Sequence, residues 1–528
     1  MNCFLLAMKN PEGAINGRIP IGLLLLSAIL GCQALSAEPL TDSEARGKQF
    51  YLTGIPPSGK PVKAMVGPES TELSGSEVPC FGCHGEDGKG RPEGGIVPTD
   101  ITFEYLSLPY GHNHDNGRKH GAFTAETILM AVTGGIDPSG NRLDSAMPRY
   151  TLSAGDSADL IAYLKRLSSD ADPGLTETTI RLGTLLPTRG PLADIGLAMK
   201  DMLSAYFDEL NVQGGIYNRK IRLEVAEFTG DADSTAKNLR RLLEDEPIFA
   251  LIAPFAPNLE QDILLLSMSR DVPQIGPYTL FPENDPIRSR ATFYLRPGLN
   301  DEAAAMVDYA ADRLHLKNPT ARVIAPADNH FQKAAEVIEK QSLIRDLGPI
   351  ALLAYPPHQF EGRSIAAELE KQPPEVIYFF GSDDELRMLL KSLKGFKPQP
   401  YVFCSGALTG TTVFNEAFYN PIFLSVLSPP NDPKNTNEFF RLIKRHRLMM
   451  HHLPAQALAY SAAKLLAEGL QRTGRKLSRK KLITTLEQIA RFDTGLMSTL
   501  SFGPGQHLGS RKVRIISATA KDNRFIKR

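Results

Sequence analysis

Cys80-Phe81-Gly82-Cys83-His84 is the stretch of sequence that decides the fold of the first part of this chain. Two thiols three residues apart can each form a thioether to a vinyl group of one porphyrin, and the histidine that follows is then held under the iron. A C-x-x-C pair alone would also fit a zinc site, thiol redox chemistry or chance. Because His84 directly follows the pair in a chain with an export-type N-terminus, we expect one covalent haem c on Cys80 and Cys83, with His84 as its proximal ligand.

A six-coordinate haem iron needs a second axial ligand, and Met147, which Pro148 follows, is the strongest candidate. A thioether ligand favours reduced iron and raises the potential relative to two imidazoles. Met130 lies in an apolar helix and is expected in the core instead.

Three histidines offer an alternative to Met147. One of His112, His114 and His120 could ligate the iron, or the three could hold a metal ion in their own loop. Because that loop is polar and rich in glycine, we expect solvated surface histidines.

The N-terminus has the layout of a secretory signal over residues 1–37. Basic residues come first, an apolar run follows over 19–30, and small residues lead to Ala37. That run of about 12 residues is shorter than the roughly 20 needed to span a bilayer. Cys32 ends a lipobox-like sequence at 29–32, so a lipid anchor is an alternative to cleavage after Ala37. Either route predicts the periplasm of a Gram-negative bacterium.

Composition excludes several functions. The 528 residues carry 59 basic and 59 acidic side chains, and this balance gives no reason to expect a nucleic acid partner. Outside the signal region and the haem motif only Cys404 remains, so no disulfide framework is expected. Motifs for a nucleophile elbow, a phosphate loop, a zinc protease and a dinucleotide fold are absent. We therefore expect a protein that is not an enzyme.

The chain divides into a haem domain at 42–169, a polar linker at 170–178 and a larger module at 179–528. In the module, strands alternate with helices of 10 to 15 residues, which predicts parallel sheets covered on both faces. The expected strands are 180–186, 221–228, 248–253, 272–275, 321–325, 350–354, 375–380, 400–404 and 422–427. The expected helices are 192–211, 234–244, 258–269, 300–315, 330–342, 362–371, 383–394 and 453–473.

Residues 42–169 resemble a class I cytochrome c. The likeness rests on a first helix with Gly47, the C-x-x-C-H-G motif, Met147-Pro148 and a last helix with Tyr163. It implies a small all-α electron-carrier domain in which Gly47 meets Tyr163 where the first and last helices cross.

Five segments after Ile180 have a recognisable pattern: 181–187, 211–215, 271–277, 293–297 and 459–470. On these segments, the run from Ile180 resembles the type I periplasmic binding proteins of the branched-chain amino-acid and amide transport class. The resemblance implies a two-lobed fold with Rossmann-like parallel sheets, lobe 1 at about 179–297 and 425–500, and lobe 2 at about 298–424 and 501–528. It also implies a small-molecule ligand in the interlobe cleft, at the carboxyl ends of the strands.

Mapping by position nominates ligand-binding residues in both lobes: Thr188, Arg189, Asn258, Tyr278, Thr279, Asn329 and Asp383. Thr188 and Arg189 open a helix and suit an anionic group, although a capped loop with a surface arginine fits equally well. The sequence departs from the family at 254–257 and 329–331, which weakens the expectation of a standard α-amino acid.

Together these features predict a periplasmic c-type cytochrome electron carrier fused to a small-solute-binding module, with binding coupled to electron transfer or sensing. Expected partners are a redox protein, such as a dehydrogenase or a terminal oxidase, and an ABC permease. One alternative is an ABC-transporter solute-binding protein with an accessory haem domain. Another is a haem-linked periplasmic oxidoreductase.

Overall fold

The computed structural model describes residues 40–518, except 86, 91–95, 115, 246, 411–419, 431 and 433–435. The expected signal segment and Cys32 lie outside these residues. Within the described part of the chain, none of the helices combines the length and the apolar character that crossing a membrane requires.

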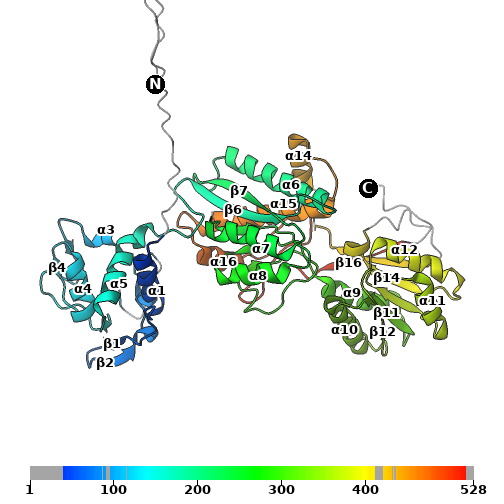
Figure 1. The fold of residues 1–528 in the computed structure, drawn as a ribbon, viewed down its shortest axis with the longest axis horizontal. Coiled ribbons are helices and arrows are strands. Elements are labelled where there is room, and N and C mark those ends of the chain that lie inside the picture. The colour runs from blue at the N-terminus through cyan, green and yellow to red at the C-terminus, as the bar shows by residue number, and fades with distance from the viewer. Residues whose placement is uncertain are drawn as a thin grey trace, which may run out of the picture. The chain divides into compact units, whose positions relative to one another are not determined.

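In the described residues of the first domain, the structure has five α-helices and five short strands (Figure 1). The helices are α1 (Asp42–Thr53), α2 (Cys80–His84), α3 (Phe103–Leu106), α4 (Ala125–Gly134) and α5 (Ala154–Arg166). The strands are β1 (Lys63–Val66), β2 (Thr71–Ser74), β3 (His112–Asn113), β4 (Lys119–His120) and β5 (Arg149–Tyr150).

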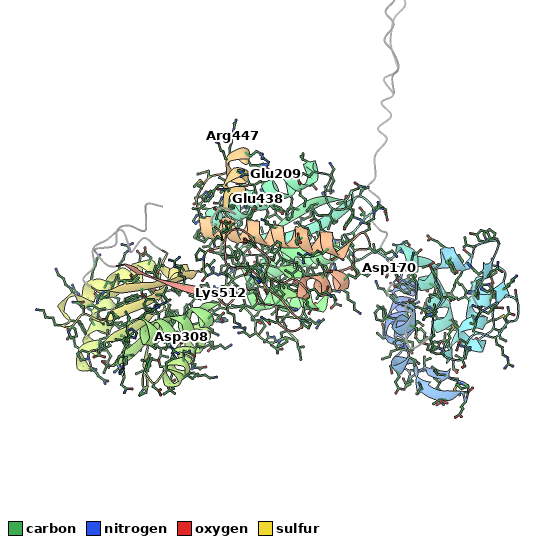
Figure 2. The ribbon with its side chains drawn as sticks, turned by 180° about the vertical axis from the view of Figure 1, so that it is seen from behind. Asp170, Glu209, Asp308, Glu438, Arg447 and Lys512 are labelled. Carbon is green, nitrogen blue, oxygen red and sulfur yellow. The ribbon has the colours of Figure 1, made fainter. Side chains whose placement is uncertain are left out.

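Helices α1 and α5 cross at a glycine and hold this domain together. Gly47 of α1 is buried, and a Cβ built there would lie 2.0 Å from the carbonyl oxygen of Asp159. The Asp159 carboxylate accepts from Arg46 at 2.7 Å beside the same contact. Asp170, just after α5, accepts a hydrogen bond from Tyr163 at 3.0 Å and pairs with Lys48 at 2.7 Å (Figure 2). The expected close crossing of the first and last helices is confirmed.

Short strands add to the helical plan that the sequence predicts for this domain. Strands β2, β1 and β5 form an antiparallel sheet, and β3 pairs with β4 in a hairpin. Strands of two to four residues carry too little alternation to be read from the sequence.

Two sheets form the described part of the larger module. In the first, five parallel strands follow the order β10-β9-β8-β6-β7. These strands are β6 (Thr179–Leu186), β7 (Lys220–Glu227), β8 (Ala250–Ile252), β9 (Gln274–Ile275) and β10 (Thr292–Phe293). The helices around it are α6 (Ala193–Val212), α7 (Ala232–Arg240), α8 (Glu260–Ser269), α14 (Asn437–His446), α15 (Leu453–Thr473) and α16 (Arg479–Glu487). One core packs α6, α14, α15 and α16 on the sheet, and a second core packs α7 and α8 (Figure 1).

The second sheet has the order β12-β11-β13-β14-β15-β16, parallel except for its last pair. Its strands are β11 (Ala321–Pro326), β12 (Ala351–Tyr355), β13 (Val376–Phe379), β14 (Tyr401–Ser405), β15 (Ile422–Leu427) and β16 (Val513–Ala518). The helices are α9 (Leu299–Asp312), α10 (Asn329–Ile344), α11 (Gly362–Lys371), α12 (Asp383–Ser392) and the short α13 (Gly406–Thr409). Cores with α9 and α10 on one side and α11 and α12 on the other cover both faces. The predicted α/β architecture with parallel sheets is confirmed.

Helix α14 carries ion pairs to both of its neighbours. Arg445 lies 2.6 Å from Glu209 of α6, and Lys464 of α15 lies 2.9 Å from Glu438 (Figure 2). Such exposed pairs are worth less than about 1 kcal/mol each. The buried face of α14, with Phe439 against Tyr460 at 5.4 Å between ring centroids, therefore contributes more to its docking.

Candidate functional site

The C-x-x-C-H motif forms the five-residue helix α2, which starts after Pro79. Cys80 and Cys83 thus lie one helical turn apart, with Cys80 half-buried and Cys83 exposed. A helical turn brings side chains at i and i+3 to one face, as thioether bonds to one porphyrin require.

His84 ends α2, and its ring is already oriented. The Nδ1 atom lies 3.1 Å from the carbonyl oxygen of Thr99; since a carbonyl only accepts, Nδ1 carries the proton. Burial lowers the pKa of His84 and so favours the neutral ring. The Nε2 atom is left as the metal ligand, in the arrangement typical of metal-binding histidines.

Met147 lies in a turn that β5 ties to the motif. It is half-buried against the core of the domain, and its backbone N–H donates to Asp144 at 3.1 Å. Three residues later, the Tyr150 hydroxyl donates to the carbonyl of Val78 and lies 4.0 Å from Sγ of Cys80. Two thiols on one turn, an oriented imidazole and a thioether on the tethered segment fit a haem c.

The sequence predicts that Met130 lies in the core, and this prediction is wrong, because the residue is 49% exposed on α4. That helix buries Ile128, Ala131 and Val132, which share one face at helical spacing, and Met130 lies off that face.

The three loop histidines come together, and the expectation of solvated side chains is wrong for two of them. His112 and His120 are buried on the paired strands β3 and β4. Nε2 of His114 lies 2.9 Å from Nε2 of His120 and 3.0 Å from the guanidinium of Arg118, which also pairs with Asp137. Since the guanidinium must donate, that nitrogen of His114 accepts. Burial, then Arg118, lowers the pKa of His114.

Metal binding by this cluster has no geometric support. Across the part of the chain that the structure describes, no group of three or more histidine, cysteine or acidic side chains is placed to hold a metal ion.

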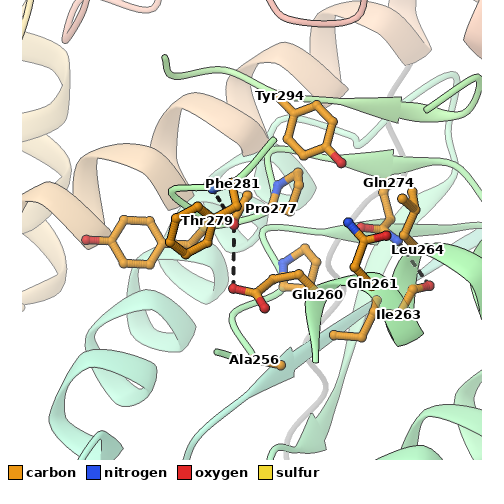
Figure 3. A pocket seen from close by; sticks show the side chains of 12 residues that line it. Ala256, Glu260, Gln261, Ile263, Leu264, Gln274, Pro277, Thr279, Phe281 and Tyr294 are labelled. Carbon is orange, nitrogen blue, oxygen red and sulfur yellow. Dashed lines mark hydrogen bonds between the residues drawn. The ribbon is translucent and has the colours of Figure 1, made fainter. Parts of the chain in front are cut away.

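In the larger module, a small pocket opens where β8 and β9 end (Figure 3). Its volume is about 20 Å³, enough for one water molecule. Tyr278 and Thr279, both predicted, line it together with Glu260, whose carboxylate lies 3.5 Å from the Thr279 hydroxyl. Burial raises the pKa of Glu260.

Thr188 and Arg189 face a carboxylate of the chain itself. The Thr188 hydroxyl donates to Glu227 of β7 at 3.1 Å, and Nε of Arg189 lies 3.3 Å from the same oxygen. The Arg189 side chain is 86% exposed. The predicted anion-binding groups are therefore engaged with an internal anion.

The other predicted residues lie at loop and helix starts. Asn258 is exposed with φ 69°. Asn329 is the exposed first residue of α10, and Asp383, the first of α12, pairs with Arg387 at 3.1 Å. The pocket in Figure 3 contains none of these three.

The sequence interpretation missed a buried pair beside Tyr278. The Arg296 guanidinium lies 5.8 Å from the centre of the Tyr278 ring and 3.5 Å from Glu302. Glu302 also accepts from Ser425 of β15 at 2.6 Å. Glu302 lies among Leu299, Ala303 and Met306 on the buried face of α9; this charge on an apolar stripe was the available signal.

Comparison with known proteins assigns both parts of the chain. Residues 179–523 match the family model described as periplasmic binding protein, and residues 77–168 match that described as cytochrome c. A Leu/Ile/Val-binding protein, BraC3 of Rhizobium johnstonii, is 19% identical over 319 residues, which are 59% of this chain and 84% of that protein.

Solved structures share the fold of the larger module. A fatty acid ABC transporter substrate-binding protein from Thermomonospora curvata has a TM-score of 0.54 at 17% identity, over 66% of this chain and 90% of that one. A substrate-binding periplasmic protein from Ralstonia solanacearum has a TM-score of 0.51 at 19% identity, over 64% and 96%. The chain therefore belongs to the periplasmic binding protein family and carries a cytochrome c domain ahead of that module.

Proposed function

We propose that this protein is a periplasmic electron carrier in which a haem c domain is fused to a small-solute-binding module. Cys80 and Cys83 hold one haem covalently, and His84 and Met147 are its axial ligands. The hydrogen bond from Nδ1 of His84 to Thr99 is the observation that carries this proposal, because it leaves Nε2 free for the iron. The haem, when bound, accepts and releases single electrons.

In the larger module, a small solute binds in the interlobe cleft at the carboxyl ends of the strands. Tyr278 and Thr279 are the best supported contacts, with Asn258, Asn329 and Asp383 from the surrounding loops. A solute carboxylate at Thr188 and Arg189 would have to displace Glu227. We therefore favour a solute whose apolar part packs on Tyr278 and on Phe255, whose ring centroid lies 5.0 Å from that of Tyr278.

The names of the relatives agree with a solute that has an apolar part, since one is described as a Leu/Ile/Val-binding protein and another as a fatty acid ABC transporter substrate-binding protein. Solute binding would be coupled to electron transfer or sensing, with a dehydrogenase or terminal oxidase as redox partner. We place the protein in the periplasm after cleavage of the signal segment, or anchored by a lipid on Cys32.

A thermal-shift screen of the haem-loaded chain tests this function. Leucine, isoleucine, valine, a medium-chain fatty acid and its amide and alcohol are added while the haem spectrum is recorded. Stabilisation without haem reduction is expected. Reduction of the haem by any of these compounds, with no other protein present, would instead support an oxidoreductase.

A matched pair of variants locates the solute site. Tyr278→Ala should abolish the stabilisation by whichever compound binds. Tyr217→Ala removes an exposed tyrosine just before β7, at the amino ends of the strands. This control variant should leave the stabilisation by the bound compound unchanged. Equal responses of the two variants would contradict the proposed cleft.

The second candidate is an ABC-transporter solute-binding protein with an accessory haem domain, which the family of residues 179–523 favours. It predicts that Met147→Ala leaves uptake of the bound solute by cells intact. An electron-carrier role predicts that the same variant slows oxidation of the reduced haem by isolated bacterial membranes.

A further inference from the structure

Arg149 is bonded to the turn that carries Met147. Its guanidinium donates to the backbone carbonyls of Leu143, at 3.0 Å, and Asp144, at 2.9 Å, and also to that of Met147. Residues 143–148 belong to no helix or strand. A single side chain therefore satisfies carbonyl groups at both ends of an irregular turn.

The guanidinium is itself held in place by its surroundings. Arg149 lies in β5, where it pairs with Met65 of β1. Gly135, which directly follows α4, has φ 67°, and a Cβ added there would lie 1.7 Å from Nε of Arg149. Only a glycine at position 135 leaves space for the guanidinium of Arg149. This side chain therefore connects α4, β5 and the methionine turn.

The next residue connects the same strand to the other side of the haem motif. Successive side chains of a strand point in opposite directions. The Tyr150 hydroxyl donates to the carbonyl of Val78, directly before Pro79 and the helix that begins at Cys80. Strand β5 therefore fixes the methionine turn through Arg149 and the cysteine helix through Tyr150.

We infer that Arg149 is a positioning residue for the axial methionine: by binding the carbonyls of the turn, it sets where the Met147 sulfur lies relative to His84. This inference rests on the proposed axial role of Met147. Hydrogen bonds from a charged donor are stronger than those between neutral groups. Loss of one such bond changes the equilibrium constant between conformations by about a factor of ten. Without the guanidinium, the turn has more conformations in which the sulfur is off the iron.

The test compares ferric holoprotein variants by the methionine-to-iron charge-transfer band and by titration with imidazole, which competes for the methionine position. In Arg149→Gln, imidazole should bind about tenfold more tightly and the band should weaken, whereas Arg149→Lys should recover part of both. Arg142→Gln changes an exposed arginine nearby in sequence and should match the wild type. Far-ultraviolet circular dichroism confirms that each variant is folded.

A double-mutant cycle with Gly135→Ala separates positioning from general damage. The new methyl group should displace the guanidinium and strengthen imidazole binding when Arg149 is present, with a much smaller effect in the Arg149→Gln background. Equal effects in both backgrounds would overturn the inference.

Met147→Ala distinguishes the two levels of the proposal. If this variant keeps the wild-type band, the axial assignment is wrong. If it loses the band while Arg149→Gln keeps both the band and the wild-type imidazole affinity, the axial assignment stands and the role of Arg149 is refuted.

Discussion

The contact between α1 and α5 makes Gly47→Ala a sharp test of the haem-domain fold. A Cβ at this position would lie 2.0 Å from the carbonyl oxygen of Asp159 and 2.7 Å from Cβ of Tyr163. Ordinary van der Waals contact begins at 3.4 Å, so the first distance is about 1.4 Å too short. Because the nearest atom belongs to the backbone of α5, no rotamer change relieves the clash and the helices must move apart.

The expected cost follows from two opposing effects. Overpacking of a well-packed contact costs about 1–3 kcal/mol, and a backbone clash belongs at the upper end of that range. Replacing a helical glycine by alanine recovers about 1 kcal/mol through helix propensity. The net loss is about 2 kcal/mol, which for a domain of this size lowers the melting temperature by roughly 8 °C. The ion pair between Arg46 and Asp159 lies at the same crossing and would be disturbed as well.

Thermal unfolding of the holoprotein, followed by the haem absorbance, measures this loss for the haem domain alone. Gly155→Ala in α5 is the matched control, because a Cβ there lies 3.8 Å from its nearest neighbour. That variant should gain about 0.5–1 kcal/mol. A Gly47→Ala protein that melts at or above the wild-type temperature would refute the close crossing.

Three further perturbations test the larger module. Arg479→Ala removes a guanidinium from several buried backbone carbonyls and should cost about 3 kcal/mol in urea unfolding, with Arg479→Lys intermediate. Burial raises the pKa of Cys404 to about 12, so a thiol reagent at pH 8 should label it only after unfolding; labelling of the native protein would contradict its position. Burial also raises the pKa of Glu302, so its contribution to stability is full below about pH 4.3 and is lost as the pH rises through the folded pKa. Above about pH 4.3, the urea concentration at the midpoint of unfolding should fall less steeply with pH in Glu302→Gln than in the wild type. An unchanged slope would show that another group is responsible.

Long periodic segments made most of the module predictable from its sequence. The helix expected at 453–473 coincides with α15, and the strand expected at 180–186 differs from β6 by one residue. Among the elements that were not predicted, strand β16 depends on a distant partner, because it pairs with β15, far earlier in the chain. Strands of two to four residues, such as β1, carry too little alternation to be recognised. Helices α14 and α16, of 10 and 9 residues, were also not predicted.

The haem site and the proposed solute site differ in how much of each can be predicted from the sequence. The haem motif is local, because two thiols and an imidazole on one turn must be neighbours in sequence, and α2 places them so. The proposed solute site draws on loops of both lobes, and position alone cannot reveal that the Thr188 hydroxyl donates a hydrogen bond to Glu227. The buried pair of Arg296 and Glu302 likewise joins residues whose burial only the fold determines.

Coupling between the two parts can be measured from either side, and thermodynamics requires the two measurements to agree. If a solute binds the reduced protein ten times more tightly than the oxidised protein, its saturation must raise the haem potential by about 59 mV, because the linkage is reciprocal. A solute that stabilises both redox states equally cannot shift the potential at all. A potential that does not move at saturation, together with equal affinities, would leave a binding module and an electron carrier on one chain without communication. A shift in potential without a matching change in affinity cannot be binding linkage, and would instead indicate that the added compound reacts with the haem.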